Sequence, residues 1–184
     1  MKSQRLLKSI IEKSFKYSET PIFPLASGRM SNYYIDCRTI LSYPEARELI
    51  GELILEKIDL QSVDSVGGME LGAFPIAIAV SDACYRITGR SLRVFIVRKQ
   101  PKGHGLKKWL EGDVGEGDRA LIVEDVVTSG RSTLTAIQRS REAGLIVSQI
   151  VSLVDRQEGG RANLEAADIS FQALFTLEDL RSPE

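Results

Sequence analysis

Four short apolar segments, rich in β-branched residues and bounded by glycine, proline or charged residues, recur along the sequence from residue 63 onward. They span residues 63–66, 93–97, 120–123 and 146–154. Short runs of this composition predict β-strands, and their nearly continuous apolar character is typical of parallel strands that are covered on both faces. The pattern therefore favours a sheet that is buried between two layers of helices.

Helical periodicity precedes and separates these segments. Apolar residues recur at spacings of three and four over residues 6–15 and 46–58. Two further helices are expected between strands, at 73–87 and 132–143, and residues 157–184 are expected to add a small peripheral strand and a terminal helix. Alternating strands and helices predict the α/β class with a mostly parallel central sheet.

Length and composition limit the possible classes of protein. A chain of 184 residues is close to one domain of ordinary size, so we expect a single domain over residues 1–184. Hydrophobic residues make up 43% and charged residues 27%, which excludes a disordered chain. The net charge of −1 removes the bulk electrostatic argument for a nucleic-acid partner. No apolar run approaches the roughly 18 residues of a membrane helix, so a cytoplasmic protein without a membrane partner is expected.

The two cysteines, Cys37 and Cys84, lie far apart without a CxxC spacing or a neighbouring group of histidines. This arrangement favours neither a disulfide framework nor a zinc site. Both residues are expected to be buried or idle thiols, and no metal-ligating residues are expected in the protein itself. Trp109 is expected to be a packing aromatic.

The most informative stretch covers residues 119–133, where an apolar strand leads directly into the acid pair Glu124 and Asp125. A small hydroxyl-rich turn with Gly130 follows, and a helix is expected to begin near Ser132. Because ligands bind at the carboxyl ends of the strands in an open parallel sheet, both acids are expected at the mouth of the crevice. Backbone N–H groups at the start of the helix can hold a phosphate, and the carboxylates suit sugar hydroxyls.

A purely structural alternative stays open for this stretch. The serines and threonines would then only cap the helix, and the acids would be solvated. The sequence contains neither the GxxxxGK[ST] pattern of a Walker loop nor a GxGxxG fingerprint after a strand. Nucleotide sites of those two kinds are therefore excluded.

A second stretch, residues 93–108, holds six basic residues and the only histidine, His104, but no acid. Gly103 and Gly105 flank this histidine, so an irregular loop is expected beyond the strand at 93–97. A movable cationic loop can close over a polyphosphate and neutralise a pyrophosphate leaving group. The alternatives are a solvated basic loop or a weak nucleic-acid patch.

The stretch 119–133 resembles the phosphoribosyl pyrophosphate (PRPP) motif of type I phosphoribosyltransferases, in which an apolar strand, two acids, two apolar residues and T-[ST]-G follow one another. The resemblance implies the fold of that class, a mostly parallel sheet flanked by helices with a small hood of N-terminal and C-terminal segments. It also implies that the acid pair holds the ribose hydroxyls and that the loop holds the 5-phosphate. The PRPP-binding residues implied in this way are Arg98, Lys99, Lys102, His104, Glu124, Asp125, Val126, Val127, Thr128, Ser129, Gly130, Arg131 and Ser132.

Four segments resemble the orotate phosphoribosyltransferase family in particular, and they occur in the family's order. They are the N-terminal signature at 23–38, the glycine-rich turn at 67–75, the basic loop R-K-x-x-K-x-H-G at 98–105 and the V-D-R-x-E-G-G element at 154–160. The matches span most of the chain, so coincidence is a poor explanation for them.

Members of that family transfer ribose 5-phosphate from PRPP to N1 of orotate, which gives orotidine 5′-phosphate and pyrophosphate in de novo pyrimidine (UMP) biosynthesis. The resemblance implies that Lys102 and His104 are catalytic residues and that, with Mg²⁺ bound mainly through the pyrophosphate, they stabilise the leaving group. Asp125 would either accept the N1 proton or steady the positively charged ribosyl group. A homodimer is also implied, because the family's catalytic loop reaches the neighbouring subunit's site.

Orotate is assigned by the resemblance to Thr128 and Arg156, and a guanidinium can bind a carboxylate through two hydrogen bonds. An ordinary surface charge or an ion-pair partner is the alternative for Arg156. Many relatives carry a lysine where this chain has Ala26, and Arg29 is the candidate for a substitute cation at the orotate end of the site.

Two rival functions stay open at this point. One is a phosphoribosyltransferase for another base, such as a purine, against which the basic loop and the element at 154–160 argue. The other is a PRPP-sensing regulator of the same fold that binds nucleic acid. The concentration of positive charge in one loop, without a second basic module, argues against that regulator.

Overall fold

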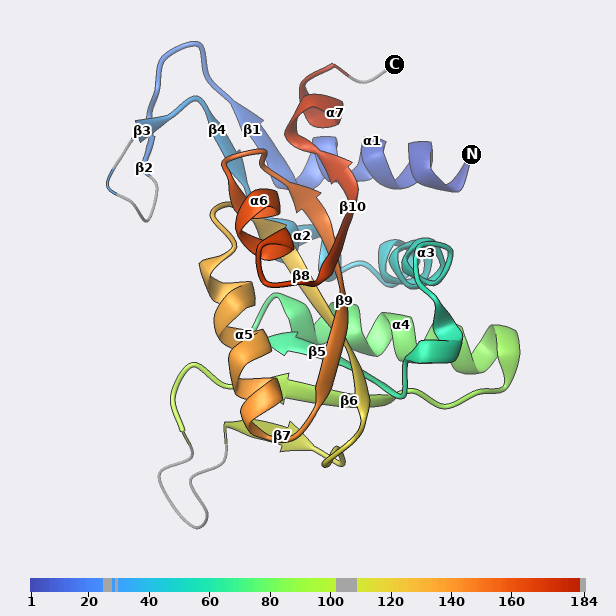
Figure 1. Cartoon of the computed structure of the whole chain (residues 1–184). Coiled ribbons are helices and arrows are strands. Elements are labelled where there is room, and N and C mark those ends of the chain that lie inside the picture. The colour runs from blue at the N-terminus through green and yellow to red at the C-terminus, as the bar shows by residue number, and fades with distance from the viewer. Residues whose placement is uncertain (25–27, 29, 102–108, 183–184) are drawn as a thin grey trace.

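The computed structural model describes residues 1–24, 28, 30–101 and 109–182. Its centre is a six-stranded sheet with the order β10-β9-β8-β5-β6-β7, in which β7 runs antiparallel to β6 and the other neighbouring pairs are parallel (Figure 1). The strands are β5 (Ser65–Met69), β6 (Arg93–Val97), β7 (Leu110–Gly112), β8 (Arg119–Val127), β9 (Ile146–Asp155) and β10 (Ser170–Thr176). The predicted α/β fold with a mostly parallel central sheet is confirmed.

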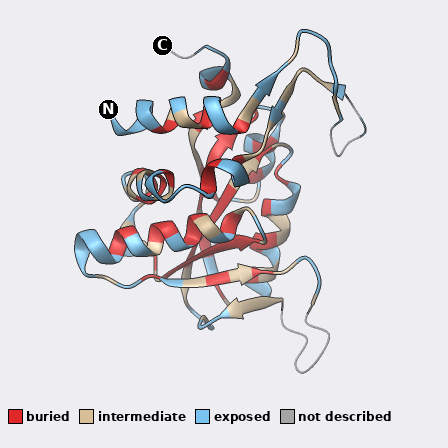
Figure 2. Ribbon diagram, turned by 180° about the vertical axis from the view of Figure 1, so that it is seen from behind, coloured by how far each residue is buried: buried red, intermediate tan, exposed pale blue. Residues whose placement is uncertain are grey.

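Helices cover both faces of this sheet. One face packs against α1 (Lys2–Ser14), α2 (Cys37–Leu41), α3 (Pro44–Leu55) and α4 (Ala73–Thr88), and the other against α5 (Arg131–Glu142) and α6 (Gly160–Glu165). Figure 1 shows α3 and α4 on one side of the strands and α5 on the other. Figure 2 shows that burial is concentrated on the strands and on the inner sides of the helices.

Strand β8 shows why polar and apolar residues do not alternate along the central strands. Leu121 and Val123 belong to the core cluster beneath α3 and α4, whereas Ala120 and Ile122 belong to the cluster beneath α5. All four are buried, because successive side chains of a strand point to opposite faces and both faces are covered. The predicted burial of both faces is confirmed.

The direction of sheet growth reverses between β5 and β8. From β5 the chain passes through α4 to β6 on one side, and from β8 it passes through α5 to β9 on the opposite side. At such a switch point the connections after two adjacent parallel strands diverge and leave a crevice outside their carboxyl ends. The turn after β5 and the loop after β8 border this crevice, which is where folds of this kind bind ligands.

The N-terminal and C-terminal segments form a small hood. Strand β1 (Phe15–Tyr17) pairs antiparallel with β4 (Tyr33–Ile35), and β2 (Phe23–Pro24) pairs antiparallel with β3 (Met30–Ser31). The terminal helix α7 (Leu177–Arg181) contacts α1, and the Arg181 guanidinium lies 5.2 Å from the centre of the Tyr33 ring. Figure 1 shows both chain ends on this side of the molecule.

Most predicted elements are present with shifted ends. Strand β8 continues beyond the predicted end at Val123 to Val127, and α5 begins at Arg131 rather than at Ser132. The strand and helix expected within 157–184 correspond to β10 and α7. The sequence pattern does not predict β7, α2 or α6, because such short elements carry no periodic signal. No helix in the described ranges is long and apolar enough to cross a membrane.

Candidate active site

The glycine-rich turn after β5 lies directly against the acid pair of β8. A Cβ atom built on Gly72 would lie 2.5 Å from the carboxyl carbon of Asp125, so a larger residue at this position would have to displace that carboxylate. The peptide bond between Glu70 and Leu71 in the same turn is cis. The turn therefore forms one wall of the crevice, and the Asp125 carboxylate lies beside it.

The loop after β8, residues 128–132, forms the opposite wall. In the part of the chain that the structure describes, its backbone N–H groups donate to no recorded acceptor. Helix α5 follows with Gly130 at its N-cap, and no side chain caps it. The capping alternative for the serines and threonines is therefore wrong. Unsatisfied N–H groups at the start of a helix form the kind of cradle that holds a phosphate.

The acids Glu124 and Asp125 lie within β8 and point to opposite sides of the sheet. Glu124 is buried on the α5 side, where its Oε2 atom accepts a hydrogen bond of 3.2 Å from the Thr133 hydroxyl. Asp125 is half-buried beside Gly72, and its Oδ1 atom accepts a bond of 2.8 Å from the backbone N–H of Val126. Both acids lie near the carboxyl end of β8, where Glu124 is buried and Asp125 is half-buried, and their placement at the mouth of the crevice stays a prediction.

Burial raises the pKa of the Glu124 carboxyl well above its ordinary value, and the neighbouring Asp125 carboxylate raises it further. The Thr133 hydroxyl lowers the pKa, because its hydrogen bond favours the charged form of the acid. Glu124 is therefore more deeply buried than Asp125, although the two acids are neighbours in the motif.

Two predicted cations, Arg98 and Lys99, follow β6, the strand beside β5. The Arg98 guanidinium lies 3.3 Å from the Glu111 carboxylate of β7, and its Nε atom donates to the Gln100 carbonyl oxygen at 3.1 Å. The backbone N–H of Lys99 donates to the Glu70 carboxylate at 2.7 Å. This last bond connects the start of the basic segment, residues 98–108, to the turn after β5. Both cations therefore lie at the same end of the sheet as the crevice.

Four residues considered for the site from the sequence lie outside the described residues. They are Lys102 and His104 of the basic segment and Ala26 and Arg29 of the N-terminal signature. Their predicted contacts with PRPP and orotate stay predictions.

Arg156 follows β9 and is 7% exposed, which excludes an ordinary surface charge. Its Nη2 atom lies 2.8 Å from the Glu158 carboxylate and 3.5 Å from the hydroxyl of Ser31 in the hood. Its Nε atom is buried and has no hydrogen-bond partner among the described residues. Since a buried guanidinium N–H is costly when unsatisfied, this atom is suited to a ligand acceptor such as a carboxylate.

The sequence does not predict the contacts between α6 and the loop 128–132. The Asn163 side chain of α6 donates a bond of 3.0 Å to the Ser129 carbonyl oxygen, and a Cβ on Gly160 would lie 2.5 Å from the Thr128 carbonyl oxygen. The adjacent glycines at 159 and 160 are the signal that could have revealed this close approach. Nothing in the sequence reveals the bond of Thr133 to Glu124, because it depends on how α5 packs against β8.

Arg38, at the end of the N-terminal signature, is a charged residue that interacts electrostatically with Asp125. Arg38 donates two side-chain bonds of 2.8 and 2.7 Å to Asp36, which lower the pKa of that carboxyl. The charge on Asp125 acts on Arg38 and on the neighbouring Cys37 thiol. Cys37 and Cys84 are both buried and free, as expected, and burial raises the pKa of Cys37.

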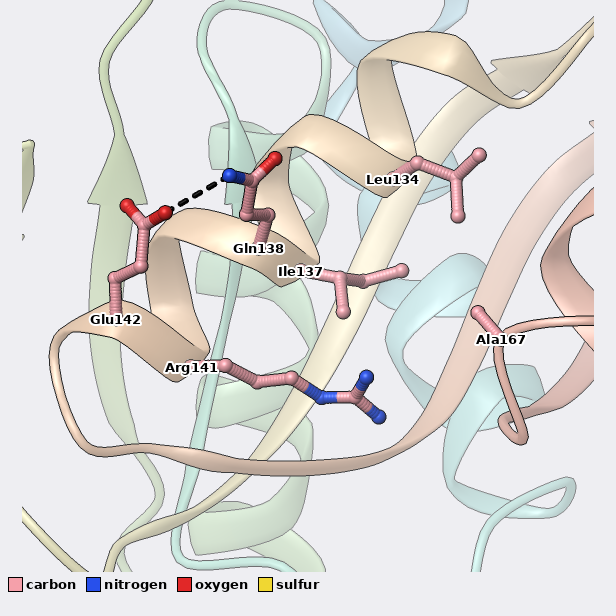
Figure 3. A pocket seen from close by; sticks show the side chains of 6 residues that line it. All are labelled: Leu134, Ile137, Gln138, Arg141, Glu142 and Ala167. Carbon is pink, nitrogen blue, oxygen red and sulfur yellow. Dashed lines mark hydrogen bonds between the residues drawn. The ribbon is translucent and has the colours of Figure 1, made fainter.

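Two surface hollows lie beside α5. The larger, about 550 Å³ in volume, is shown in Figure 3, and it is lined by Leu134, Ile137, Gln138, Arg141, Glu142 and Ala167. The smaller, about 350 Å³, is lined by Trp109, Leu110, Gly112, Val114, Arg139, Glu142 and Ala143. Neither lining includes the acid pair, the loop 128–132 or Arg156, so neither hollow coincides with the candidate active site.

Three kinds of recognition meet at this crevice. The loop 128–132 offers N–H groups for a phosphate, and Asp125 offers a carboxylate for hydroxyl groups. The basic residues Arg98, Lys99 and Arg156 follow strands that end at the same side of the sheet. A phosphorylated sugar that carries further anionic groups is complementary to this combination.

Solved structures with the same fold define the class. The protein is similar to the Mycobacterium tuberculosis H37Rv orotate phosphoribosyltransferase in complex with Fe(III) dicitrate, with a TM-score of 0.85, 33% identity and coverage of 98% of this chain and 99% of that chain. A structure of the same enzyme with 5-phospho-alpha-D-ribosyl 1-diphosphate (PRPP) has a TM-score of 0.80 and 30% identity, and covers 99% of this chain and 100% of that chain. The fold is that of a type I phosphoribosyltransferase.

Sequence relatives give the family within this class. Orotate phosphoribosyltransferase of Aquifex aeolicus (strain VF5) is 40% identical over 180 residues, which cover 98% of both proteins. No protein-family model matches the sequence. At this identity and coverage, the chain belongs to the orotate phosphoribosyltransferase family, and the resemblance seen in the four sequence motifs is confirmed.

Proposed function

We propose that this protein catalyses the Mg²⁺-dependent transfer of ribose 5-phosphate from PRPP to N1 of orotate, a step of pyrimidine (UMP) biosynthesis. The C1–O bond to the pyrophosphate breaks, a bond from C1 to N1 of orotate forms, and the N1 proton is released. As the C1–O bond lengthens, positive charge grows on the ribosyl ring and negative charge grows on the pyrophosphate. The main task of the protein is to stabilise this separation of charge.

The observation that carries the proposal is the loop 128–132, whose N–H groups have no acceptor in the described chain and which follows Asp125 closely. We assign the 5-phosphate of PRPP to this loop and the ribose hydroxyls to the acid pair Glu124 and Asp125. The pyrophosphate is assigned to the side of Arg98 and Lys99, where the turn after β5 borders the crevice.

The orotate carboxylate is assigned to Arg156, because the buried Nε atom of this residue lacks a partner among the described residues. The backbone N–H of Arg156 donates to the Val127 carbonyl oxygen at 2.9 Å, so Arg156 and Thr128 lie on adjoining loops. This adjacency supports the assignment of orotate to both residues. Arg29 is proposed as the further cation at this end, in place of the lysine that Ala26 replaces.

The leaving group is assigned to Lys102, His104 and Mg²⁺. Among the described residues, no group of three or more histidine, cysteine or acidic side chains could hold a metal ion without the substrate. Mg²⁺ commonly binds one or two carboxylates together with substrate phosphates, and the half-buried Asp125 carboxylate fits that mode. When it is bound through the pyrophosphate, Mg²⁺ neutralises the negative charge that develops there.

We also propose a cytoplasmic homodimer in which the basic segment of one subunit serves the site of the other. Helix α4 carries an exposed apolar row of Phe74, Ile78 and Tyr85, and Leu71 lies exposed just before the helix. Exposed apolar patches of this kind are typical of interfaces. Free cysteines are typical of a reducing compartment. Sedimentation velocity should give the mass of a dimer, and a monomer at assay concentrations would contradict this proposal.

The test of the activity is a spectrophotometric assay of orotate loss with PRPP and Mg²⁺, repeated with EDTA and with purine bases in place of orotate. Orotate should be lost in the metal-containing reaction, and the purines should not react. Consumption of a purine instead of orotate would favour the first rival function. Salt-dependent retention of nucleic acid without any orotate loss would favour the regulator.

A further inference from the structure

One arginine of α5 contacts the chain on both sides of the basic segment. The Arg139 guanidinium carbon lies 3.8 Å from the centre of the Trp109 ring, and its Nη1 atom donates a hydrogen bond to the carbonyl oxygen of Arg98. Arg98 directly follows β6, and Trp109 directly precedes β7. A single side chain therefore joins the two points between which residues 99–108 run.

The same two points are joined to each other. The backbone N–H of Arg98 donates to the Trp109 carbonyl oxygen at 2.8 Å, and the Arg98 guanidinium lies 3.3 Å from the Glu111 carboxylate. Val97 and Leu110 are partners in the antiparallel pairing of β6 with β7. These contacts close the base of the basic segment, and the arginine of α5 packs on that closed base.

Helix α5 links this base to the phosphate-binding candidate. The helix of 12 residues begins at Arg131, within the loop 128–132, and carries Arg139 in its second half. The Arg139 side chain is half-buried, its guanidinium covers the only tryptophan of the chain, and it satisfies a main-chain carbonyl. A solvated surface arginine makes neither contact. Lysine cannot reproduce the planar stacking together with the directed hydrogen bond.

We propose that Arg139 is a positioning residue that fixes the two ends of the basic segment relative to the loop 128–132. This inference rests on the proposed function, in which Lys102 and His104 act on the pyrophosphate. Arg139 would fix the position of the two ends of their segment relative to the 5-phosphate site. The leaving group carries more negative charge in the transition state than in bound PRPP. A displaced base should therefore lower turnover more than it lowers substrate affinity.

Arg139→Ala and Arg139→Lys test this inference, and Arg141→Ala is the matched control. Arg141 lies on the same helix, but it lines the larger hollow (Figure 3). Its Nη2 atom donates to the Val147 carbonyl oxygen at 3.1 Å. Arg139→Ala should lower kcat about 10- to 100-fold, with KM for orotate changed by less than about threefold. Arg139→Lys should recover part of kcat, because an ammonium can still lie over the ring. The control should stay within about twofold of the wild type.

The fluorescence of Trp109, the only tryptophan, gives a second measurement that does not depend on turnover. Its emission and its quenching by acrylamide should change in Arg139→Ala and stay unchanged in Arg141→Ala. Adding pyrophosphate with Mg²⁺ should alter the emission of the wild type, and this response should be reduced in Arg139→Ala.

Two results would overturn the inference. One is a loss of thermal stability in Arg139→Ala with normal kcat, and the other is a pyrophosphate response that is absent from the wild type or equal in both proteins. A wild type that does not consume orotate would instead contradict the proposed function, and the pyrophosphate titration of Trp109 would then still decide the role of Arg139.

Discussion

The two ends of the central sheet differ in how completely their polar groups are satisfied by the protein itself. Near the amino ends of β5 and β8, the Asp64 carboxylate accepts two bonds of 2.7 Å from the Arg119 guanidinium and lies 3.4 Å from Arg90. At the carboxyl ends, the N–H groups of residues 128–132 and the Nε atom of Arg156 have no partner in the described chain. Charges at the first end are neutralised within the protein, whereas the second end has hydrogen-bonding capacity left over for a ligand.

The carboxyl groups at the two ends show the same contrast. The hydrogen bonds from Arg119 hold the pKa of Asp64 below its ordinary range, whereas burial raises the pKa of Glu124. An acid with a built-in cation contributes to stability, and an acid without one is costly until a ligand compensates it. Substitutions at the carboxyl end should therefore change activity, and substitutions at the amino end should change stability.

The largest effect is expected for Asp125→Asn. The substitution keeps the shape of the side chain but removes the negative charge that faces the ribosyl group, so kcat should fall by about 10³-fold. The melting temperature should change little, because Asp125 is half-buried at the edge of the crevice and makes no ion pair that the structure records among the described residues. Steady-state kinetics and thermal unfolding on the same preparation give both values.

The pH profile of the wild type distinguishes the two roles left open for Asp125. If Asp125 accepts the N1 proton, kcat of the wild type has an acid limb that Asp125→Asn lacks. If it only steadies the ribosyl group, both proteins keep the same limb at different heights. Wild-type turnover in Asp125→Asn would contradict both roles and the ribose assignment with them.

A smaller loss of activity is expected for Lys102→Ala and His104→Ala. Each removes a cation or proton donor that acts on the leaving pyrophosphate, so kcat should fall by about 10²-fold while the Kd of PRPP changes much less. Turnover assays and calorimetric titration with PRPP measure the two quantities. Lys57→Ala, an exposed lysine outside the crevice, is the control for general loss of positive charge. Weakened PRPP binding with normal kcat would reject the leaving-group role.

The sequence predicts the long elements well because burial imposes their pattern. The predicted bounds of β6, residues 93–97, are the observed ones, and α4 covers Ala73–Thr88 where 73–87 was expected. The sequence does not predict β7 and α6, because contacts with distant parts of the chain stabilise these two elements. Strand β7 depends on its pairing with β6, and α6 lies against the loop after β8 through Asn163.

The sequence predicts which loops form the candidate site, but it does not predict the directions in which their side chains point. The motif locates the loop 128–132 and the acid pair, because the spacing of strand, acids and small residues is local in sequence. It does not show that Glu124 turns inward, since that depends on which face of β8 meets α5. The contact of Ser31 with Arg156 joins residues far apart in the chain, and no local pattern records it.

Thr133→Val should have an intermediate effect, because it removes the hydroxyl that donates to Glu124 at 3.2 Å and keeps the shape of the side chain. KM for PRPP should rise about tenfold, the value of a lost bond to a charged group. The acid limb of kcat/KM should move to higher pH, since the hydroxyl lowers the pKa of Glu124. Thr135→Val is the control, because its hydroxyl donates to the Arg131 carbonyl oxygen instead. An unmoved limb would show that Glu124 does not titrate in the reaction.

The smallest effect on activity is expected at the opposite end, for Asp64→Asn. kcat should stay within about twofold of the wild type, whereas the melting temperature should fall by about 2–4 °C at neutral pH, as for the loss of a partly exposed ion pair. The pKa of Asp64 is lowered in the folded protein, so its contribution is complete above the unfolded pKa of about 4 and is lost as the pH falls further. The difference in melting temperature should therefore be the same at pH 7 and pH 5 and shrink below about pH 4. A fall in kcat comparable to that of Asp125→Asn would mean that the two ends are not separate in function.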